Sequence, residues 1–171
     1  MIYMSYVIAI DVGIKNLSFV VWDFASAKCV RWDNVSLVSS GRYIPANNVA
    51  YVKAFVKRYE HYFDNAFALI IERQIRCNMR IIESILQTMF YDRTYIISAK
   101  CVKAHYNLSH KNYKANKAAA VEWANSFVLN NPHVFETGLA DSFNRSRKQD
   151  DLADCLLLLM YYLDTYSNQV S

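Results

Sequence analysis

The first part of the chain alternates short apolar runs with polar turns. The apolar run Val7–Ile10 ends at Asp11, and a second run, Leu17–Trp22, follows a turn that contains one Gly and one Asn. Gly and Asn tolerate positive φ angles, and β-branched and aromatic residues prefer strands, so this segment predicts a β-hairpin. Residues 28–35 also alternate and predict a third strand that pairs with the second. The N-terminal part is therefore predicted to be a three-stranded antiparallel meander.

The middle of the chain alternates helical and strand patterns. Apolar residues recur at helical spacing over residues 49–63 and over Met79–Tyr91, and each segment predicts an amphipathic helix. The wholly apolar run Phe67–Ile71 is typical of a strand covered on both faces, and residues 94–98 predict a fifth strand. These strands extend the meander into one sheet.

The C-terminal part predicts a helix over residues 116–129, a polar loop over 133–149 and an apolar helix that begins at Asp150. The fold class is therefore α/β, with a five-stranded mixed sheet, a three-stranded antiparallel meander plus two further strands, flanked by helices. With 54% hydrophobic residues, 3 Gly and 2 Pro, the 171 residues are expected to form a single domain, 1–171.

Several protein classes are disfavoured by composition. No apolar run approaches the roughly 20 residues that span a bilayer, and the N-terminus lacks the order of a signal peptide, so we expect an intracellular, soluble protein. The four cysteines form no C-x-x-C pair, which argues against a disulfide framework or a zinc knuckle. The four histidines show no ligand spacing and are expected in the core or on the surface.

The positive charge is concentrated in one stretch. Between Arg93 and Val121 there are six Lys or Arg and no acidic residue, with Tyr106 and Tyr113 among them. A patch of one sign with interleaved aromatics suits a polyanion such as nucleic acid. A solvated basic face explains it equally well.

Carboxylates stand at the ends of predicted elements. Asp11 and Glu72 each end an apolar strand, and Asp151 and Asp154 are three apart, so they share one face of the last helix. Hard divalent cations require such oxygen clusters. Each acid alone also has a simpler interpretation, because Asp11 can cap its turn and the helix pair can cap the helix N-terminus.

Three motifs together resemble a known family. D-x-G-x-x-N in the hairpin, I-E-R-Q at Glu72 and D-D-x-A-D at the last helix resemble the RuvC-type Holliday junction resolvases of the ribonuclease H-like fold, especially the poxvirus and fungal mitochondrial branch. The resemblance extends from about Val7 to Tyr162. It implies that Asp11, Glu72, Asp151 and Asp154 bind metal, that Asp150 is a non-ligand acid, and that Lys117 is the active-site lysine, with Lys114 one turn away as the alternative.

The resemblance also implies the reaction and its partners. It implies symmetrical nicking of four-way DNA junctions by a homodimer, with two Mg²⁺ ions per active site and Mn²⁺ as a substitute. We expect Met79–Tyr91 to form the dimer interface, and we expect no membrane and no small-molecule cofactor. If the viral branch is right, the protein acts in the host cytoplasm, in virus factories. The residues expected to contact DNA are Lys15, Arg73, Arg76, Arg80, Lys111, Lys114, Arg145, Arg147 and Lys148.

Two groups of alternatives remain open. Actin-like ATPases and sugar kinases share the first hairpin, but they need a second lobe and further Gly-rich turns, and this chain has 3 Gly. A catalytically degenerate branched-DNA-binding module, or another ribonuclease H-like nuclease, is closer. Metal binding separates the degenerate module from a nuclease.

Overall fold

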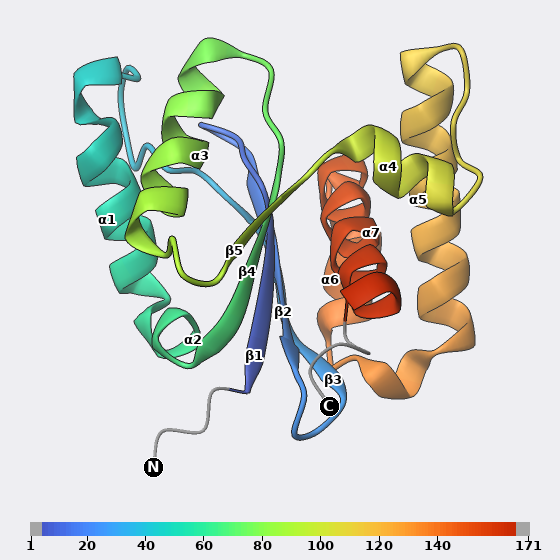
Figure 1. Ribbon diagram of the computed structural model, residues 1–171. Coiled ribbons are helices and arrows are strands. Elements are labelled where there is room, and N and C mark those ends of the chain that lie inside the picture. Colours follow the sequence, from blue (N-terminus) through green and yellow to red (C-terminus); the bar gives the residue numbers. More distant parts are fainter. Residues whose placement is uncertain (1–4, 167–171) are drawn as a thin grey trace.

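A five-stranded sheet separates two layers of helices (Figure 1). The computed structural model describes residues 5–166, and the strand order is β3-β2-β1-β4-β5. β1 pairs antiparallel with β2, β2 pairs antiparallel with β3, and β1–β4 and β4–β5 are parallel pairs. The predicted meander with two further strands is confirmed. The strands are β1 Tyr6–Asp11, β2 Leu17–Asp23, β3 Lys28–Val35, β4 Ala66–Glu72 and β5 Thr94–Ile97.

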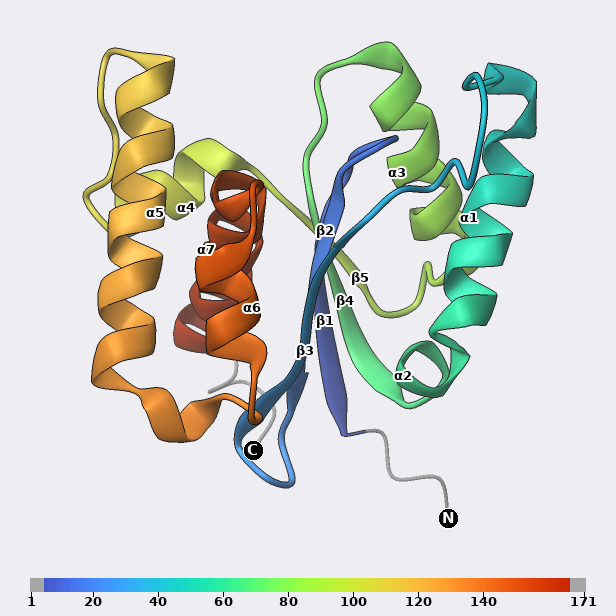
Figure 2. The same cartoon turned by 180° about the vertical axis from the view of Figure 1, so that it is seen from behind.

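The helices cover the two faces of the sheet unequally (Figures 1 and 2). α1, α2 and α3 pack on one face, and α4 to α7 cover the other, where α7 lies between the sheet and α5. Within residues 5–166, no helix is long and apolar enough to cross a membrane. The helices are α1 Asn48–Arg58, α2 Glu60–Asp64, α3 Cys77–Met89, α4 Ala99–His105, α5 Tyr113–Asn130, α6 Leu139–Arg145 and α7 Gln149–Tyr166, with short 3₁₀ turns at Pro45–Asn47 and Pro132–Val134.

Several predicted helix boundaries were wrong. The single helix predicted over residues 49–63 is broken at Tyr59, whose buried ring packs 4.6 Å from that of Phe19. α3 begins two residues before Met79 and ends before Phe90. α5 begins at Tyr113, because the Asn112 side chain accepts a hydrogen bond from the Lys114 backbone N–H at 2.8 Å and caps the helix there.

Two helices were missed. α4 follows β5 directly, and Ser98 caps it by accepting from the Lys100 backbone N–H. α6 lies inside the predicted polar loop, after Gly138 at φ 88°, and its Phe143 ring stacks 4.5 Å from that of Trp32. Each has only seven residues, too few for a clear apolar period.

Successive side chains of β1 point to opposite faces of the sheet. Val7 and Ala9 belong to the core under α7, whereas Ile8 and Ile10 belong to the core under α1 and α3. Asp11, the next residue in this alternation, therefore points to the α7 side. α7 is held there by two buried hydrogen bonds, from Cys155 Sγ to the Ala9 carbonyl at 3.1 Å and from Trp32 Nε1 to the Leu152 carbonyl at 3.1 Å.

Candidate active site

Three elements bring four acids together at one edge of the sheet. Asp11 ends β1, and Glu72 ends β4, its parallel neighbour, in which Ile10 is paired with Ile71. Parallel strands end at the same edge of a sheet, so the two carboxylates are neighbours. The first turns of α7 add Asp151 and Asp154, and Asp154 is buried. The acid cluster, as we call Asp11, Glu72, Asp151 and Asp154, is thus assembled from residues up to 143 positions apart in the chain.

Burial and mutual repulsion oppose ionisation in the acid cluster. Burial, followed by the charge of Asp154, raises the pKa of Asp11 to about 7, although Lys117 and a hydrogen bond from Gln74 act in the other direction. Burial and then the charges of Asp11 and Asp154 raise the pKa of Glu72 well above its ordinary value. The cluster is therefore short of positive charge, which a bound cation would supply.

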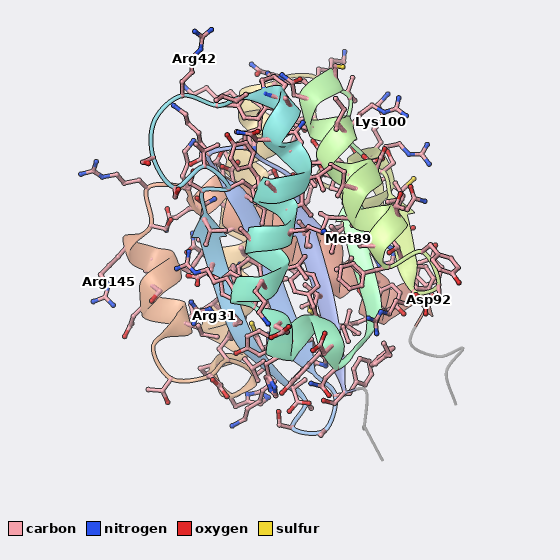
Figure 3. The ribbon with its side chains drawn as sticks, turned by 90° about the vertical axis from the view of Figure 1, so that its left-hand side faces the viewer. Arg31, Arg42, Met89, Asp92, Lys100 and Arg145 are labelled. Atoms are coloured by element: carbon pink, nitrogen blue, oxygen red, sulfur yellow. The ribbon has the colours of Figure 1, made fainter. Side chains whose placement is uncertain are left out.

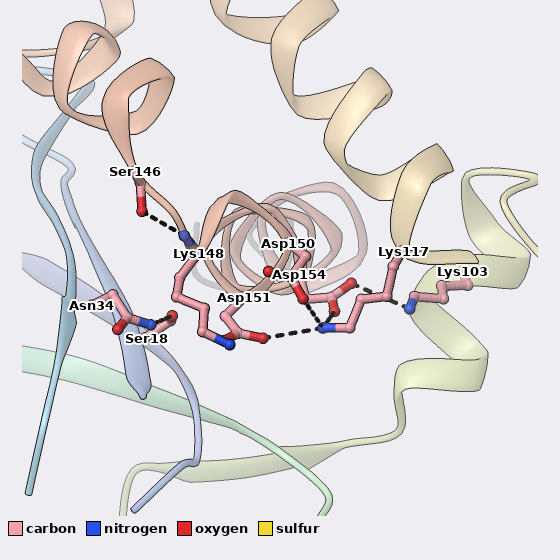
Figure 4. Close-up of polar contacts among 9 residues, drawn as sticks. All are labelled: Ser18, Asn34, Lys103, Lys117, Ser146, Lys148, Asp150, Asp151 and Asp154. Carbon is pink, nitrogen blue, oxygen red and sulfur yellow. Dashed lines mark hydrogen bonds and ion pairs between the residues drawn. The ribbon is translucent and has the colours of Figure 1, made fainter. Parts of the chain in front are cut away.

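Lys117 lies at the centre of the acids of α7 (Figure 4). It reaches from α5, and its Nζ is 2.8 Å from Asp154 Oδ2, 3.1 Å from Asp151 Oδ1 and 3.3 Å from Asp150 Oδ2. Burial disfavours its charge, but the three carboxylates outweigh burial and raise its pKa. Burial likewise disfavours the charge of Asp150, yet Lys117 lowers the pKa of that carboxyl below its ordinary value. Lys114, one turn earlier, is exposed.

Two neighbours of the acid cluster were missed by the sequence analysis. Lys103, on α4, places its Nζ 3.2 Å from Asp154 Oδ1 (Figure 4), within ion-pair range although that buried oxygen accepts no hydrogen bond. Gln74 donates from Nε2 to Asp11 Oδ1 at 3.4 Å. Gln74 lies in the I-E-R-Q motif, which was the available signal for it. Lys103 belongs to the basic stretch between Arg93 and Val121, but its contact with Asp154 depends on the position of α4, a helix that the sequence analysis missed.

A polar row continues from Asp11 across the sheet. Asp11 is paired with Ser18 on β2, and Ser18 is paired with Asn34 on β3. Asn34 Nδ2 donates to Ser18 Oγ at 2.8 Å, and Ser18 is completely buried (Figure 4). Lys148, between α6 and α7, places its Nζ 3.9 Å from Asp151 Oδ2.

Comparison with known proteins places the chain in a family. The family model for the poxvirus A22 protein matches residues 5–165. The chain belongs to this family. No curated protein matches the sequence at a significant level.

Solved structures share the fold of this A22-family chain. The fowlpox virus Holliday junction resolvase is 18% identical over 94% of this chain and 98% of its own, with a TM-score of 0.67. The yeast mitochondrial Holliday junction resolvase is 19% identical over 100% and 89%, with a TM-score of 0.69. Thermus thermophilus RuvC in complex with a Holliday junction substrate is 17% identical over 95% of this chain and 97% of its own, with a TM-score of 0.55. The predicted RuvC-like, ribonuclease H-like fold is confirmed.

The chemistry of the acid cluster fits divalent cations. Its donors are all carboxylates, burial and the charges of neighbouring acids raise the pKa of Asp11 and of Glu72, and the buried Asp154 Oδ1 lacks a hydrogen-bond donor. In the part of the chain that the structure describes, no three His, Cys, Asp or Glu side chains are arranged to hold an ion as they stand. The ammonium groups of Lys117 and Lys103 lie among the acids instead, so an entering ion has to displace them.

The nine basic residues expected to contact DNA are all exposed and lie on several segments. Lys15, Arg73 and Lys148 are each within four residues of an acid of the cluster. Arg145 extends from α6 into solvent (Figure 3). The others lie before or within α3 (Arg76 and Arg80), before or in the first turn of α5 (Lys111 and Lys114), and between α6 and α7 (Arg147).

Proposed function

We propose that this A22-family protein is a Holliday junction resolvase, a metal-dependent endonuclease that nicks four-way DNA symmetrically, with residues 1–171 acting as one nuclease domain. The observation that carries the proposal is the acid cluster at the ends of two parallel strands and one buried helix. The family match supports it. Two of the proteins that share the fold are named Holliday junction resolvases, and the RuvC structure contains a Holliday junction substrate.

In this proposal Asp11, Glu72, Asp151 and Asp154 hold the divalent ions, two Mg²⁺ per site with Mn²⁺ as a substitute. When bound, these ions supply the positive charge that stabilises the transition state of phosphodiester hydrolysis. The chain's own residues do the rest. Lys117, displaced from Asp151 and Asp154, is within side-chain reach of a phosphate at the cluster and offsets its negative charge. Asp150, which is part-buried, holds Lys117 near the cluster.

The exposed basic residues bind the DNA backbone. Arg73 directly follows β4, and Lys15 lies in the turn after β1, so both are near the acid-bearing strand ends and are expected to contact phosphates beside the acid cluster. The other exposed residues proposed to contact backbone phosphates are Arg76, Arg80, Lys111, Lys114, Arg145, Arg147 and Lys148. Contacts of this kind are to phosphate and are sequence-independent, so junction affinity falls steeply as salt rises.

A four-way junction has paired strands, so symmetrical nicking requires two active sites at a fixed separation. We assign the dimer contact to α3, as the sequence suggested. Ile81 and Met89 on α3 are 41% and 39% exposed, and Met89 stands on the open face of that helix in Figure 3. A groove of about 780 Å³ lies between α1 and α3 and is lined mainly by apolar side chains. Burial of this groove against a second copy gives the homodimer its apolar contact. If the protein is viral, the reaction takes place in the host cytoplasm, in virus factories.

A mobile synthetic four-way junction tests the function. Purified protein with Mg²⁺ or Mn²⁺ is expected to give paired nicks at symmetrical positions on opposite strands, and EDTA is expected to abolish them. Linear duplex of the same sequence is the control. Absence of paired nicks at every salt and metal concentration would contradict the proposal.

One observation favours a second candidate, a catalytically degenerate branched-DNA-binding module. Lys117 and Lys103 already neutralise part of the acid cluster, and no ready-made metal arrangement is present in residues 5–166. Such a module binds junctions but is not stabilised by metal. A melting experiment with and without Mg²⁺ separates the two candidates, because an ion that binds only the folded chain raises its melting temperature.

A further inference from the structure

Glu83 is an acid on the inner face of an otherwise apolar helix surface. It lies on α3 between the completely buried Ile82 and the buried Leu86, and it is 6% exposed. A buried carboxylate is costly unless it is hydrogen-bonded. Its partner is the backbone N–H of Gln74, which donates to Glu83 Oε2 at 2.5 Å. Glu83 thus ties α3 to the segment that follows β4.

Gln74 connects this tie to the acid cluster. Its side-chain Nε2 donates to the Glu72 carbonyl oxygen at 3.1 Å and to Asp11 Oδ1 at 3.4 Å. One residue therefore contacts both strands whose ends carry Asp11 and Glu72. The 3.4 Å separation is long for an N–H···O hydrogen bond, so Gln74 restrains the Asp11 carboxylate without fixing it.

The backbone of the same segment is held from another side. The Arg73 N–H donates to the Ile97 carbonyl of β5 at 2.8 Å. The Gln74 backbone N–H donates to Glu83, and this hydrogen bond fixes the backbone from which the Gln74 side chain extends to Asp11. Without Glu83, the Gln74 backbone loses this restraint and is held only by its covalent connection to β4 and by the Arg73 hydrogen bond.

We propose that Gln74 and Glu83 are positioning residues for the acid cluster: Glu83 fixes the Gln74 backbone, and the Gln74 amide orients the Asp11 carboxylate toward a divalent ion. This inference rests on the proposed metal-binding role of Asp11. Hydrogen bonds that orient a ligating carboxylate govern both its direction and its affinity for metal. A purely structural role for Glu83 would instead stabilise the fold and leave metal affinity unchanged.

Four variants test the inference: Gln74→Met, Glu83→Leu, Glu83→Gln and the control Glu136→Leu, which replaces an exposed acid outside α3 and outside the acid cluster. The first readout, without DNA, is the Mg²⁺ concentration that gives half of the full rise in melting temperature. The second is the Mg²⁺ concentration for half-maximal junction nicking. We expect Gln74→Met and Glu83→Leu to need about 10- to 100-fold more Mg²⁺ in both assays. Junction affinity in EDTA is expected to stay within about twofold, because metal takes no part in that measurement.

Glu83→Gln is the rescue variant, because its side-chain oxygen can accept the same N–H with almost the same volume. It is expected to behave like wild type, as is Glu136→Leu. Wild-type Mg²⁺ dependence in Gln74→Met refutes the inference, and so does a Glu83→Gln protein as impaired as Glu83→Leu. If Glu83→Leu does not fold, the Mg²⁺ dependence of Gln74→Met alone tests the inference, because Gln74 is only part-buried. A wild-type protein that Mg²⁺ neither stabilises nor activates refutes the proposed function, and this inference with it.

Discussion

Lys117→Met removes one positive charge from the middle of the acid cluster and keeps most of the side-chain length. In the metal-free protein this charge is 2.8 Å from Asp154 Oδ2 and 3.1 Å from Asp151 Oδ1, and the lysine side chain is 17% exposed. At an effective dielectric constant of about 20, one such pair at 3 Å has a gross attraction of about 5 kcal/mol. The desolvation cost of the lysine cancels much of this.

Removing one partner from a buried pair costs about 3–5 kcal/mol, because the other charges stay buried without compensation. In a chain of this size, that corresponds to a fall in melting temperature of about 10 °C. The same variant no longer has to give up an ammonium contact when a divalent ion enters. We therefore expect metal-free Lys117→Met to be less stable than wild type, and its stabilisation by saturating Mg²⁺ to be larger.

The assay is thermal unfolding in EDTA and across a Mg²⁺ titration, without DNA. Lys114→Met is the matched control, because Lys114 is exposed and lies one turn before Lys117 on the same helix. Its metal-free stability is expected to stay within about 0.5 kcal/mol of wild type. If Lys117→Met shows wild-type stability in EDTA and a wild-type response to Mg²⁺, then Lys117 does not act as the internal counter-ion of the acids.

Three further outcomes are expected. The metal-free protein should gain stability as pH falls from 8 to 6, because Asp11 (pKa about 7) and Glu72 have raised pKa values and the folded chain takes up protons that the unfolded chain does not; unfolding in EDTA measures this, and a flat profile would contradict it. Asp11→Asn should slow junction nicking by about three decades, a loss of ~4 kcal/mol, with junction binding kept; a variant within tenfold of wild type would show that Asp11 is not a ligand. Trp32→Phe should cost about 1–2 kcal/mol in chemical denaturation by removing the bond to the Leu152 carbonyl. Trp123→Phe is the control, because the Trp123 indole N–H makes no hydrogen bond within residues 5–166. An equal loss of unfolding free energy in both variants would show that the smaller ring, not the lost hydrogen bond, causes the effect.

The sheet could be predicted because its signals are local. The alternation in β1 defines which side chains share a face, so it also places Asp11 on the side of the helix that carries Asp154. Glu72 follows from the same logic, since a buried strand parallel to β1 has to end at the same edge. Spacing was sufficient to predict the strands and the carboxylates at their ends because a period of two leaves little freedom. The grouping of the four acids came from the family resemblance, and the parallel pairing of β1 with β4 from the structure.

The lysines around the acids depended on tertiary geometry and were only partly predictable. α4 and α6 are one or two turns long, and their positions are set by Ser98 capping and by the Phe143 ring on Trp32. Lys103 faces Asp154 only because α4 crosses α7, which no periodicity in the sequence encodes. The family resemblance identified Lys117 as the active-site lysine. Its distances from the acids are set by the packing of α5 on α7, which the sequence did not predict.

α7 carries two acids of the acid cluster and also forms part of the core. The acids Asp151 and Asp154 are followed by an unbroken buried run to Leu159, clamped to the sheet by Cys155 and Trp32. A substitution in that run shifts the acids and loosens the core together. Residues 152–159 therefore cannot vary to adjust the positions of these two acids without also changing the packing of the core. Sequence changes that alter the proposed activity but preserve the fold are expected among exposed residues outside this run.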